Sequence, residues 1–358
     1  MRIDFEPIAS VSDVEEVAAI IEIRTLFYGA TYVADLEWDE DALLASFLEL
    51  VADPATRDDF AKERAAGVQE AKDRLLSDLY AFIAERHKGL AENSPFRWRF
   101  EEGLLLESRN RSELTMAGVG YLWMTFHWLL QSDKNYLVID GPDREKFRIQ
   151  FTAVFEQICC YAIAGYRPAA VWYFGSGRSV AEFLLRLRNL TLACGNGKPK
   201  AHDQLEENQR GANDGGVDLM AIELQDGAIR NSALAFLVGA TLQKSDRRGK
   251  IMGMPEIDRF TSFFQEKPLL GYKGILAVPF PRTLIEAQNC RDQNGLYFGR
   301  EDLLRFLGQA PTGRTRGHLR YPGTKLRRAT ESFIDGLVMV SNDADLPLYL
   351  PEPPAEVA

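Results

Sequence analysis

The sequence predicts an α+β protein, in which a helical N-terminal domain precedes a mixed α/β domain. Apolar residues recur at helical spacing through much of the first 130 residues, and the pattern changes after residue 216 to short apolar runs typical of strands. The segment Asp140-Gly141-Pro142-Asp143 interrupts the periodic pattern between them. We therefore expect a helical domain over 1–140, an α/β domain over 141–310, and a basic segment with a tail over 311–358.

The first domain shows helix signals in chain order. Ser12 to Glu15 forms a capping box, and acids at 39–41 precede a second apolar stripe, where they suit the positive end of a helix dipole. Asp53-Pro54 is expected to end that helix, and another helix is expected over 58–88. The apolar run 121–130 is too short to span a membrane, and it predicts a buried helix or strand.

The second domain mixes both periods. A stripe over 147–162 predicts a helix, 173–177 a loop, and 180–190 a helix that ends near Gly195. Runs at 217–224 and 234–242 predict strands around an Asp226-Gly227 turn, the second of them buried and central. A helix near 255–265 and a third strand over 275–280 follow. Because of Pro279, we expect that third strand at an edge, and 337–340 predicts a late strand or a helix turn.

Composition excludes several protein classes. No run of about 18 uncharged apolar residues predicts a membrane span, and the mixed, acidic start predicts no signal peptide. The four cysteines lack CxxC spacing, so we expect buried thiols in a reducing cytoplasm and no zinc site. Residues 1–80 hold 19 acids and 7 bases, whereas the remainder is nearly balanced. Contact with DNA is therefore expected in the second half.

Two segments carry a resemblance to a known family. Asn213-Asp214-Gly215-Gly216-Val217-Asp218-Leu219-Met220-Ala221 resembles the segment of two glycines and an aspartate in Mrr-like nucleases, and the strand after it ends in Gly239-Ala240-Thr241-Leu242-Gln243-Lys244-Ser245. With the order of elements, these segments make 147–280 similar to the PD-(D/E)xK restriction-endonuclease-like core, of αβββαβ type. Phe155-Glu156 and Phe174-Gly175 also resemble an uncharacterised subgroup found among bacterial antiviral defence genes.

The resemblance implies a Mg²⁺ (or Mn²⁺) site. It makes Asp218 a metal ligand, with Gln243 and Lys244 as further catalytic residues and Glu182 as an outside candidate for the metal. In such chemistry a metal polarises the phosphate and activates water, and a lysine stabilises the developing charge. The sequence departs from the pattern because Ala240 or Leu242 occupies the place of the second ligand. Gln243 and Lys244 are adjacent, so a regular strand would point them to opposite faces.

Each candidate also has a structural interpretation. Asp218 could be a strand-edge acid, and Asp214 is better explained as a turn residue beside two glycines. Glu223 is expected to face solvent. Glu182 completes a second capping box with Ser179, which we favour over a metal role. Lys244 could be a solvated charge.

Basic residues are candidates for phosphate contact. Arg247, Arg248 and Lys250 follow the proposed site, and a later segment without acids adds Arg314, Arg316, Arg320, Lys325, Arg327 and Arg328. The alternative is that this later segment docks on the acidic N-terminal half or on an acidic partner. Gly175-Ser176-Gly177-Arg178 could cradle a phosphate before a helix, but it lacks the Walker pattern and is better explained as structural.

Three functions remain open from the sequence. The first is a Mg²⁺-dependent DNA endonuclease, or the nuclease subunit of a bacterial antiphage defence system, with DNA and a protein partner as ligands and no membrane. The second is a catalytically degenerate nuclease fold that serves as a scaffold or binding subunit, and oligomers are possible in either case. The third is a helical regulatory protein without nucleic acid, which the sequence pI of about 5.1 favours.

Overall fold

The computed structural model describes residues 2–5, 7–10, 14–28, 30–32, 36–99, 105–109, 114–131, 137–139, 141–174, 179–210, 215–242, 253–280, 284–309 and 338–339. The chain divides into two compact units, one formed by 1–147 with 330–358 and the other by 148–329. The combination of helices with a mixed sheet confirms the predicted α+β class. Among the described helices, none has the length and apolar content to cross a bilayer.

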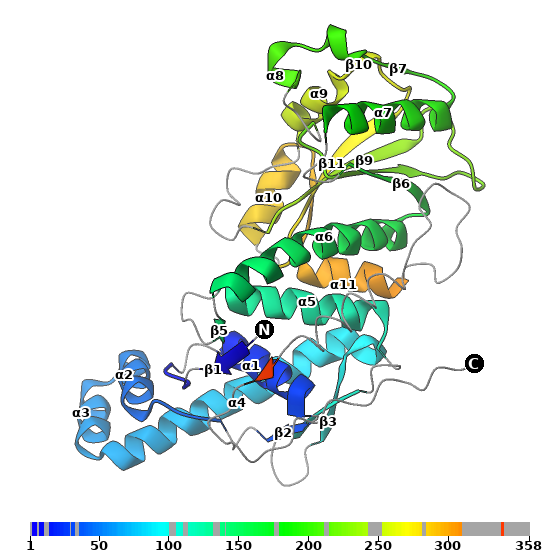
Figure 1. Cartoon of the computed structure of the whole chain (residues 1–358). Coiled ribbons are helices and arrows are strands. Elements are labelled where there is room, and N and C mark those ends of the chain that lie inside the picture. The colour runs from blue at the N-terminus through cyan, green and yellow to red at the C-terminus, as the bar shows by residue number, and fades with distance from the viewer. Residues whose placement is uncertain are drawn as a thin grey trace, which may run out of the picture. The chain divides into compact units, whose positions relative to one another are not determined.

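The first unit is mainly helical (Figure 1). Its helices are α1 (Val14–Tyr28), α2 (Glu40–Leu50), α3 (Pro54–Lys62), α4 (Arg64–Leu90), the 3-10 turn η2 (Ala91–Asn93) and α5 (Met116–Leu130). Two small sheets accompany them, in the orders β13-β1-β5 and β2-β4-β3. Their strands are β1 (Arg2–Phe5), β2 (Ala30–Tyr32), β3 (Phe96–Arg99), β4 (Leu105–Ser108), β5 (Leu137–Ile139) and β13 (Val338–Met339).

Local capping explains where these helices begin. Asp39 accepts a hydrogen bond from the Ala42 N–H at the start of α2. Asp53 caps α3, and Pro54 is the first residue of that helix. The prediction that Asp53-Pro54 ends a helix was therefore incomplete, because proline also suits the first helical turn. The apolar run 121–130 lies in α5, which is buried on all sides, and 338–339 is a strand.

The second unit is built around a five-stranded sheet in the order β12-β11-β9-β8-β6. The strands β6 (Ala169–Tyr173), β8 (Leu219–Glu223) and β9 (Leu234–Ala240) are antiparallel neighbours, whereas β9, β11 (Gly271–Ala277) and β12 (Leu296–Phe298) are parallel. The helices are α6 (Gly141–Tyr166), α7 (Val180–Cys194), α8 (Glu207–Arg210), α9 (Met254–Thr261), α10 (Leu284–Asp292) and α11 (Arg300–Gln309). The short elements β7 (Lys198–Pro199), η4 (His202–Gln204) and β10 (Phe264–Glu266) complete it.

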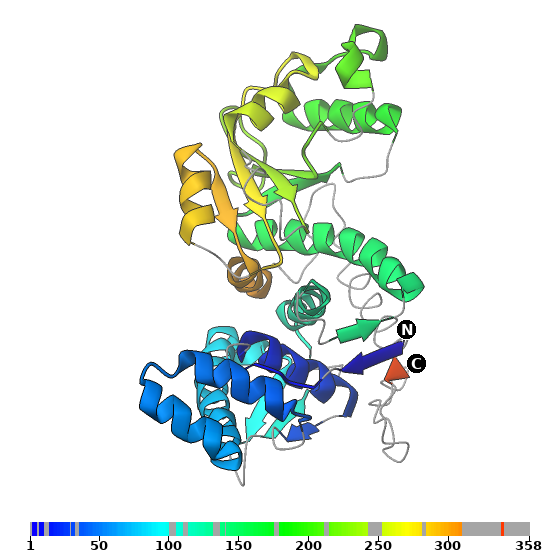
Figure 2. The ribbon, with the colours of Figure 1, turned by 90° about the vertical axis from the view of Figure 1, so that its left-hand side faces the viewer.

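Aromatic contacts show which helices cover which face of this sheet. Tyr166 at the end of α6 packs against Phe236 of β9. It also packs against Phe298 of β12 and Phe306 of α11. On the other face, Phe183 of α7 and Phe260 of α9 surround Phe174. Figure 2 shows the same layers, with the sheet between the two sets of helices. The sheet is therefore buried on both faces, as its near-continuous apolar strands require.

Several predictions for this unit are confirmed, and two need correction. The buried central strand is β9, the 255–265 helix is α9, and Asp226-Gly227 forms a turn in which both residues have positive φ. Tyr173 was assigned to a loop but ends strand β6. The prediction of an edge position for the third strand was wrong, because β12 pairs with β11 and Pro279 lies beyond the strand.

Candidate functional site

Asp218 joins the ends of two neighbouring strands. It lies just before β8, where its N–H donates to the carbonyl of Val238 and its own carbonyl accepts the N–H of Phe174. Strand β9 continues past the start of β8, so the amide of Ala240 meets a side chain instead of a strand. The Asp218 carboxylate accepts that N–H at 2.6 Å. This contact fixes the orientation of the carboxyl group at the end of β9.

The two glycines before Asp218 determine how the chain enters β8. Gly215 and Gly216 have φ of 64° and 83°, a region that favours glycine. A Cβ on Gly215 would lie 3.1 Å from the rings of Phe183 and Phe263, so the close packing also requires glycine. The turn predicted at the two glycines is confirmed, while Asp214 lies outside the described residues.

A second carboxylate approaches the same region from helix α6. Glu156 is only 4% exposed, and the hydroxyl of Tyr173 in β6 donates a hydrogen bond to its Oε2. Burial raises the pKa of the Cys160 thiol, and the nearby charges of Glu156 and Asp218 raise it further. Glu156 thus contacts Tyr173, the last residue of β6, and the N–H of the next residue, Phe174, donates to the carbonyl of Asp218. All four cysteines are buried, as predicted.

Sequence analysis did not select Glu156 as a site residue. The available signal was its surroundings, because residues 154–164 are otherwise apolar or small except for Gln157 and Tyr161. A single carboxylate in such a helix cannot reach solvent on any face and needs a built polar environment. Helical periodicity gave no sign of Glu156, because this residue lies within an apolar stripe that predicts only a buried helix face.

Thr241 adds a buried polar atom at the same strand end. Its side chain is 5% exposed, and its Oγ1 has no hydrogen-bond partner among the described residues. Its backbone N–H donates to the carbonyl of Ala277 in β11, which continues the parallel ladder by one residue. The end of β9 thus presents a hydroxyl beside the amide that holds Asp218.

The other predicted site residues divide into two groups. Glu182 is exposed on α7 and forms the expected capping box: its carboxylate accepts the Ser179 N–H at 3.2 Å, and the Ser179 hydroxyl accepts the Glu182 N–H at 3.3 Å. Glu223 pairs with Arg167 at 3.2 Å. The remaining candidates lie outside the described residues, namely Gln243, Lys244, Arg247, Arg248, Lys250, Arg314, Arg316, Arg320, Lys325, Arg327 and Arg328.

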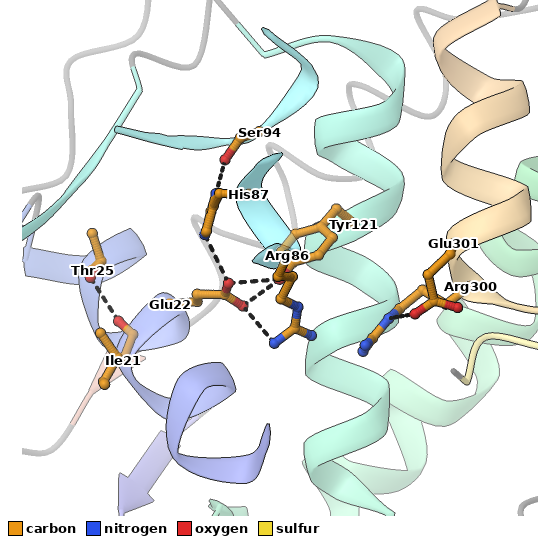
Figure 3. Close-up of polar contacts among 9 residues, drawn as sticks. All are labelled: Ile21, Glu22, Thr25, Arg86, His87, Ser94, Tyr121, Arg300 and Glu301. Atoms are coloured by element: carbon orange, nitrogen blue, oxygen red, sulfur yellow. Dashed lines mark hydrogen bonds and ion pairs between the residues drawn. The ribbon is translucent and has the colours of Figure 1, made fainter. Parts of the chain in front are cut away.

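The first unit contains a different polar cluster (Figure 3). Glu22 is fully buried and accepts hydrogen bonds from the Tyr121 hydroxyl at 2.7 Å, with His87 Nε2 at 3.2 Å and Arg86 Nη1 at 3.7 Å. His87 Nδ1 bonds Ser94 Oγ. Burial would raise the pKa of Glu22, but Arg86, His87 and Tyr121 outweigh it, so its pKa is lowered.

The Ser94–His87–Glu22 chain has the order of residues of a catalytic triad, but its serine is not accessible to a substrate. Ser94 is 4% exposed, and its hydroxyl also accepts the N–H of Phe96. A nucleophile must reach a substrate carbonyl, which this burial prevents. We therefore interpret the cluster as a structural network that ties α1, α4 and α5 together.

The chain was compared with protein families, curated proteins and solved structures. No protein-family model and no curated protein matches the chain. Among solved structures, the MspJI restriction endonuclease in complex with a 27-mer oligonucleotide is weakly similar, with 11% identity and a TM-score of 0.25. That match covers 62% of this chain and 38% of the enzyme. Protein VC1899 from Vibrio cholerae has 10% identity and a TM-score of 0.19, over 75% of this chain and 80% of that one.

These similarity values are too low to carry an argument about fold or activity. The matched region also spans well under half of the restriction endonuclease. Any functional assignment for this chain therefore depends on the residues around Asp218.

Proposed function

We propose that the chain is a Mg²⁺-dependent DNA endonuclease whose site is centred on Asp218. The observation that carries the proposal is the carboxylate of Asp218 held at the end of β9, with the buried Glu156 close by from α6. Two carboxylates that approach one strand end are a common source of metal ligands in phosphodiester hydrolysis. When α7 and the short elements β7, η4, α8 and β10 are left out, the αβββαβ order of α6, β6, β8, β9, α9 and β11 agrees with the resemblance of the sequence to restriction-endonuclease-like nucleases.

The chemistry of the donors fits a hard cation. Mg²⁺ prefers oxygen ligands, which Asp218 and Glu156 would supply, and the Thr241 hydroxyl is a further oxygen at the same strand end. Within the described part of the chain, no three His, Cys, Asp or Glu side chains converge on one point. The proposed site therefore also needs Gln243 and Lys244. When bound, the metal would polarise the phosphate and activate a water molecule.

The surrounding residues would hold the carboxylates in place. The Ala240 amide fixes one oxygen of Asp218, and the Tyr173 hydroxyl fixes one oxygen of Glu156. Groups that are locked by such contacts can bind a cation without losing further conformational freedom. Lys244 is proposed to stabilise the negative charge that develops on the phosphate.

The test is cleavage of plasmid and linear DNA in Mg²⁺ or Mn²⁺ by wild type, Asp218→Asn and Lys244→Ala. We expect each substitution to reduce the cleavage rate by at least about 100-fold. Glu223→Gln is the matched control, because Glu223 is a half-buried carboxylate at the other end of β8 that pairs with Arg167. Control activity should stay within about twofold of wild type. Equal losses in Asp218→Asn and Glu223→Gln would contradict the proposed site.

A catalytically inactive subunit is the second candidate, and one observation favours it. The end of β9 places Ala240 and Leu242 where related nucleases carry a metal ligand, and Ala240 uses its amide to hold Asp218. Folded wild type that cleaves no DNA, alone or with co-purified partners, would support this alternative. The proposed role in antiphage defence depends on the sequence resemblance, and loss of phage protection in cells that carry Asp218→Asn would test it.

A further inference from the structure

Helix α7 has apolar residues on two sides. One stripe is buried against the sheet and contains Phe183, Leu187 and Leu190. On another side, Leu185 and Leu192 are 56% and 73% exposed. They are seven residues apart, or two helical turns, so they lie on the same side of the helix. An exposed leucine pair at this spacing is typical of a helix that packs against another helix.

A groove of about 680 Å³ runs along the exposed side of α7. Leu184, Leu185 and Arg188 line one wall, and the segment from β7 to η4 lines the other with Lys198, Lys200 and His202. Figure 1 shows α7 and the β7–β10 pair at the same end of the sheet. The lining therefore combines apolar side chains of α7 with the basic residues Arg188, Lys198 and Lys200, which we call the basic rim, and Leu192 is not part of the lining.

The basic residues of the groove form no ion pair among the described residues, although Glu266 of β10 is opposite Lys198 in the β7–β10 pair. Arg188, Lys198 and Lys200 form no ion pair with any described residue, and no acid is found among the described residues that line the groove. Glu182 is the acid of the first turn of α7, and it is engaged by the capping box with Ser179. A ligand with negative charge would meet these cations without displacing an internal partner.

We infer that this groove binds an acidic amphipathic helix of a partner protein. The apolar part of the lining, with the exposed Leu185, matches a helix that inserts apolar side chains at every third or fourth residue, while flanking carboxylates reach the basic rim. Single-stranded nucleic acid is less suited, because base stacking needs aromatic platforms and the lining that the structure describes contains no Phe, Tyr or Trp. This inference is independent of the proposed nuclease activity.

A second groove, in the first unit, has a mainly acidic lining instead. The groove between α2, α3 and α4 in the first unit also has an apolar floor, with Phe47 and Phe60. Its rim carries Asp53, Glu70, Asp73 and Asp78 against one arginine, Arg74. An acidic helix would be repelled there. We therefore expect no binding of such a helix at this second groove.

The test uses the full chain and a fluorescein-labelled synthetic helix with leucines on one face and glutamates beside them. We expect binding at about 100 µM or tighter by fluorescence anisotropy, with weaker binding as salt rises. The variant Leu185→Ser/Arg188→Glu should weaken binding at least about tenfold. The control Ile285→Ser/Arg291→Glu changes an exposed apolar residue and an exposed arginine on α10, and it should stay within about twofold.

Two results would overturn the inference. One is equal binding of the glutamate helix to both double variants, or no binding to wild type at about 1 mM. The other is binding of a single-stranded or duplex oligonucleotide that is lost in the Leu185→Ser/Arg188→Glu variant while the glutamate helix does not bind. That second result would make the groove a nucleic-acid contact. A helix with lysines in place of the glutamates should bind wild type at least about tenfold more weakly.

Discussion

The two units hold the carboxylates of Glu22, Glu156 and Asp218 with different kinds of groups. In the first unit, Glu22 is surrounded by an arginine, a histidine and a tyrosine, so a cationic side chain faces its charge (Figure 3). In the second unit, the contacts that fix Asp218 and Glu156 include two neutral donors, a backbone amide and a phenol. Both residues contact the end of β6, because Glu156 accepts the hydroxyl of Tyr173 and the Asp218 carbonyl accepts the N–H of the next residue, Phe174.

This difference separates a structural role from a functional one. A carboxylate matched by a buried cation stabilises the fold, and its removal leaves that cation uncompensated. Two carboxylates gathered near one strand end repel each other, and proteins retain such arrangements mainly where they bind or react. Substitutions should therefore affect stability in the first unit and activity in the second.

The largest expected effect is on stability, from Glu22→Gln. Glutamine can still accept the Tyr121 hydrogen bond, but it removes the negative charge that lies 3.7 Å from the buried guanidinium of Arg86. We expect the free energy of unfolding to fall by about 3–5 kcal/mol. Chemical denaturation followed by circular dichroism measures it. The control Glu49→Gln, an exposed acid on α2, should change stability by less than about 0.5 kcal/mol. A loss below about 1 kcal/mol in Glu22→Gln would remove the contrast between the units.

The same network predicts an acid-sensitive fold. The pKa of Glu22 is lower in the folded chain than its ordinary value of 4.5, so the folded state favours the carboxylate. This contribution to stability is complete above the unfolded pKa and is lost as the pH falls through the lower, folded pKa. Unfolding free energies measured from pH 7 down to below 4.5 should therefore decline more steeply for wild type than for Glu22→Gln. Parallel curves would show that Glu22 does not titrate in this way.

Elements with strong local signals were predictable from the sequence. Helix α7 begins with the Ser179 capping box and ends at Gly195 with φ of 67°, and both signals are local. Strand β9 was recognised because its seven residues are all apolar or small, a pattern typical of a central strand, and the four in its middle are buried. The short strand β6 was missed because Ala169-Ala170 is a weak strand former, and its conformation depends on pairing with β8. Strands β1 to β5 of the first unit have three or four residues and were missed for the same reason, whereas β13 lies in the 337–340 run for which a late strand was one expectation.

An intermediate effect on stability is expected from glycine substitutions, which separate the cost of positive φ from the cost of close packing in the turn before Asp218. Gly215→Ala adds both positive-φ strain and a contact with Phe183 and Phe263 at 3.1 Å. Gly227→Ala adds strain alone, because no described atom lies within 4 Å of the new Cβ. We expect losses of about 3 and 1 kcal/mol, measured by denaturant unfolding. Equal losses would show that the packing around Gly215 can relax.

A small stability effect is expected from Asp218→Asn, in contrast with Glu22→Gln. The asparagine oxygen can still accept the Ala240 N–H, and the substitution removes one of two neighbouring negative charges. The free energy of unfolding should change by less than about 1 kcal/mol. Asp218→Ala should cost about 1–2 kcal/mol more, because the amide loses its acceptor. A large loss in Asp218→Asn would assign Asp218 the same structural role as Glu22.

The candidate site was less predictable than the fold. Asp218 was found because two glycines and an aspartate form a local pattern, and those glycines do adopt positive φ. Glu156 lies 62 residues earlier in the chain, and only the pairing of β6 with β8 and the packing of α6 bring it close. The Ser94–His87–Glu22 chain likewise joins three elements, and no spacing in the sequence indicates it. Sequence patterns report neighbours along the chain, whereas these sites depend on neighbours in space.

The smallest expected effect on stability concerns Glu182. The sequence allowed two roles for this residue, a helix cap and a metal ligand. Glutamine at this position retains an oxygen that can accept the Ser179 N–H, so Glu182→Gln should lower stability by less than about 0.5 kcal/mol. Ser179→Ala removes the hydroxyl that accepts the Glu182 N–H and should cost about 1 kcal/mol. If the chain cleaves DNA, both variants should cleave at the wild-type rate. Cleavage lost in Glu182→Gln but kept in Ser179→Ala would instead show that the charge of Glu182 serves the metal, because only the first variant removes a carboxylate.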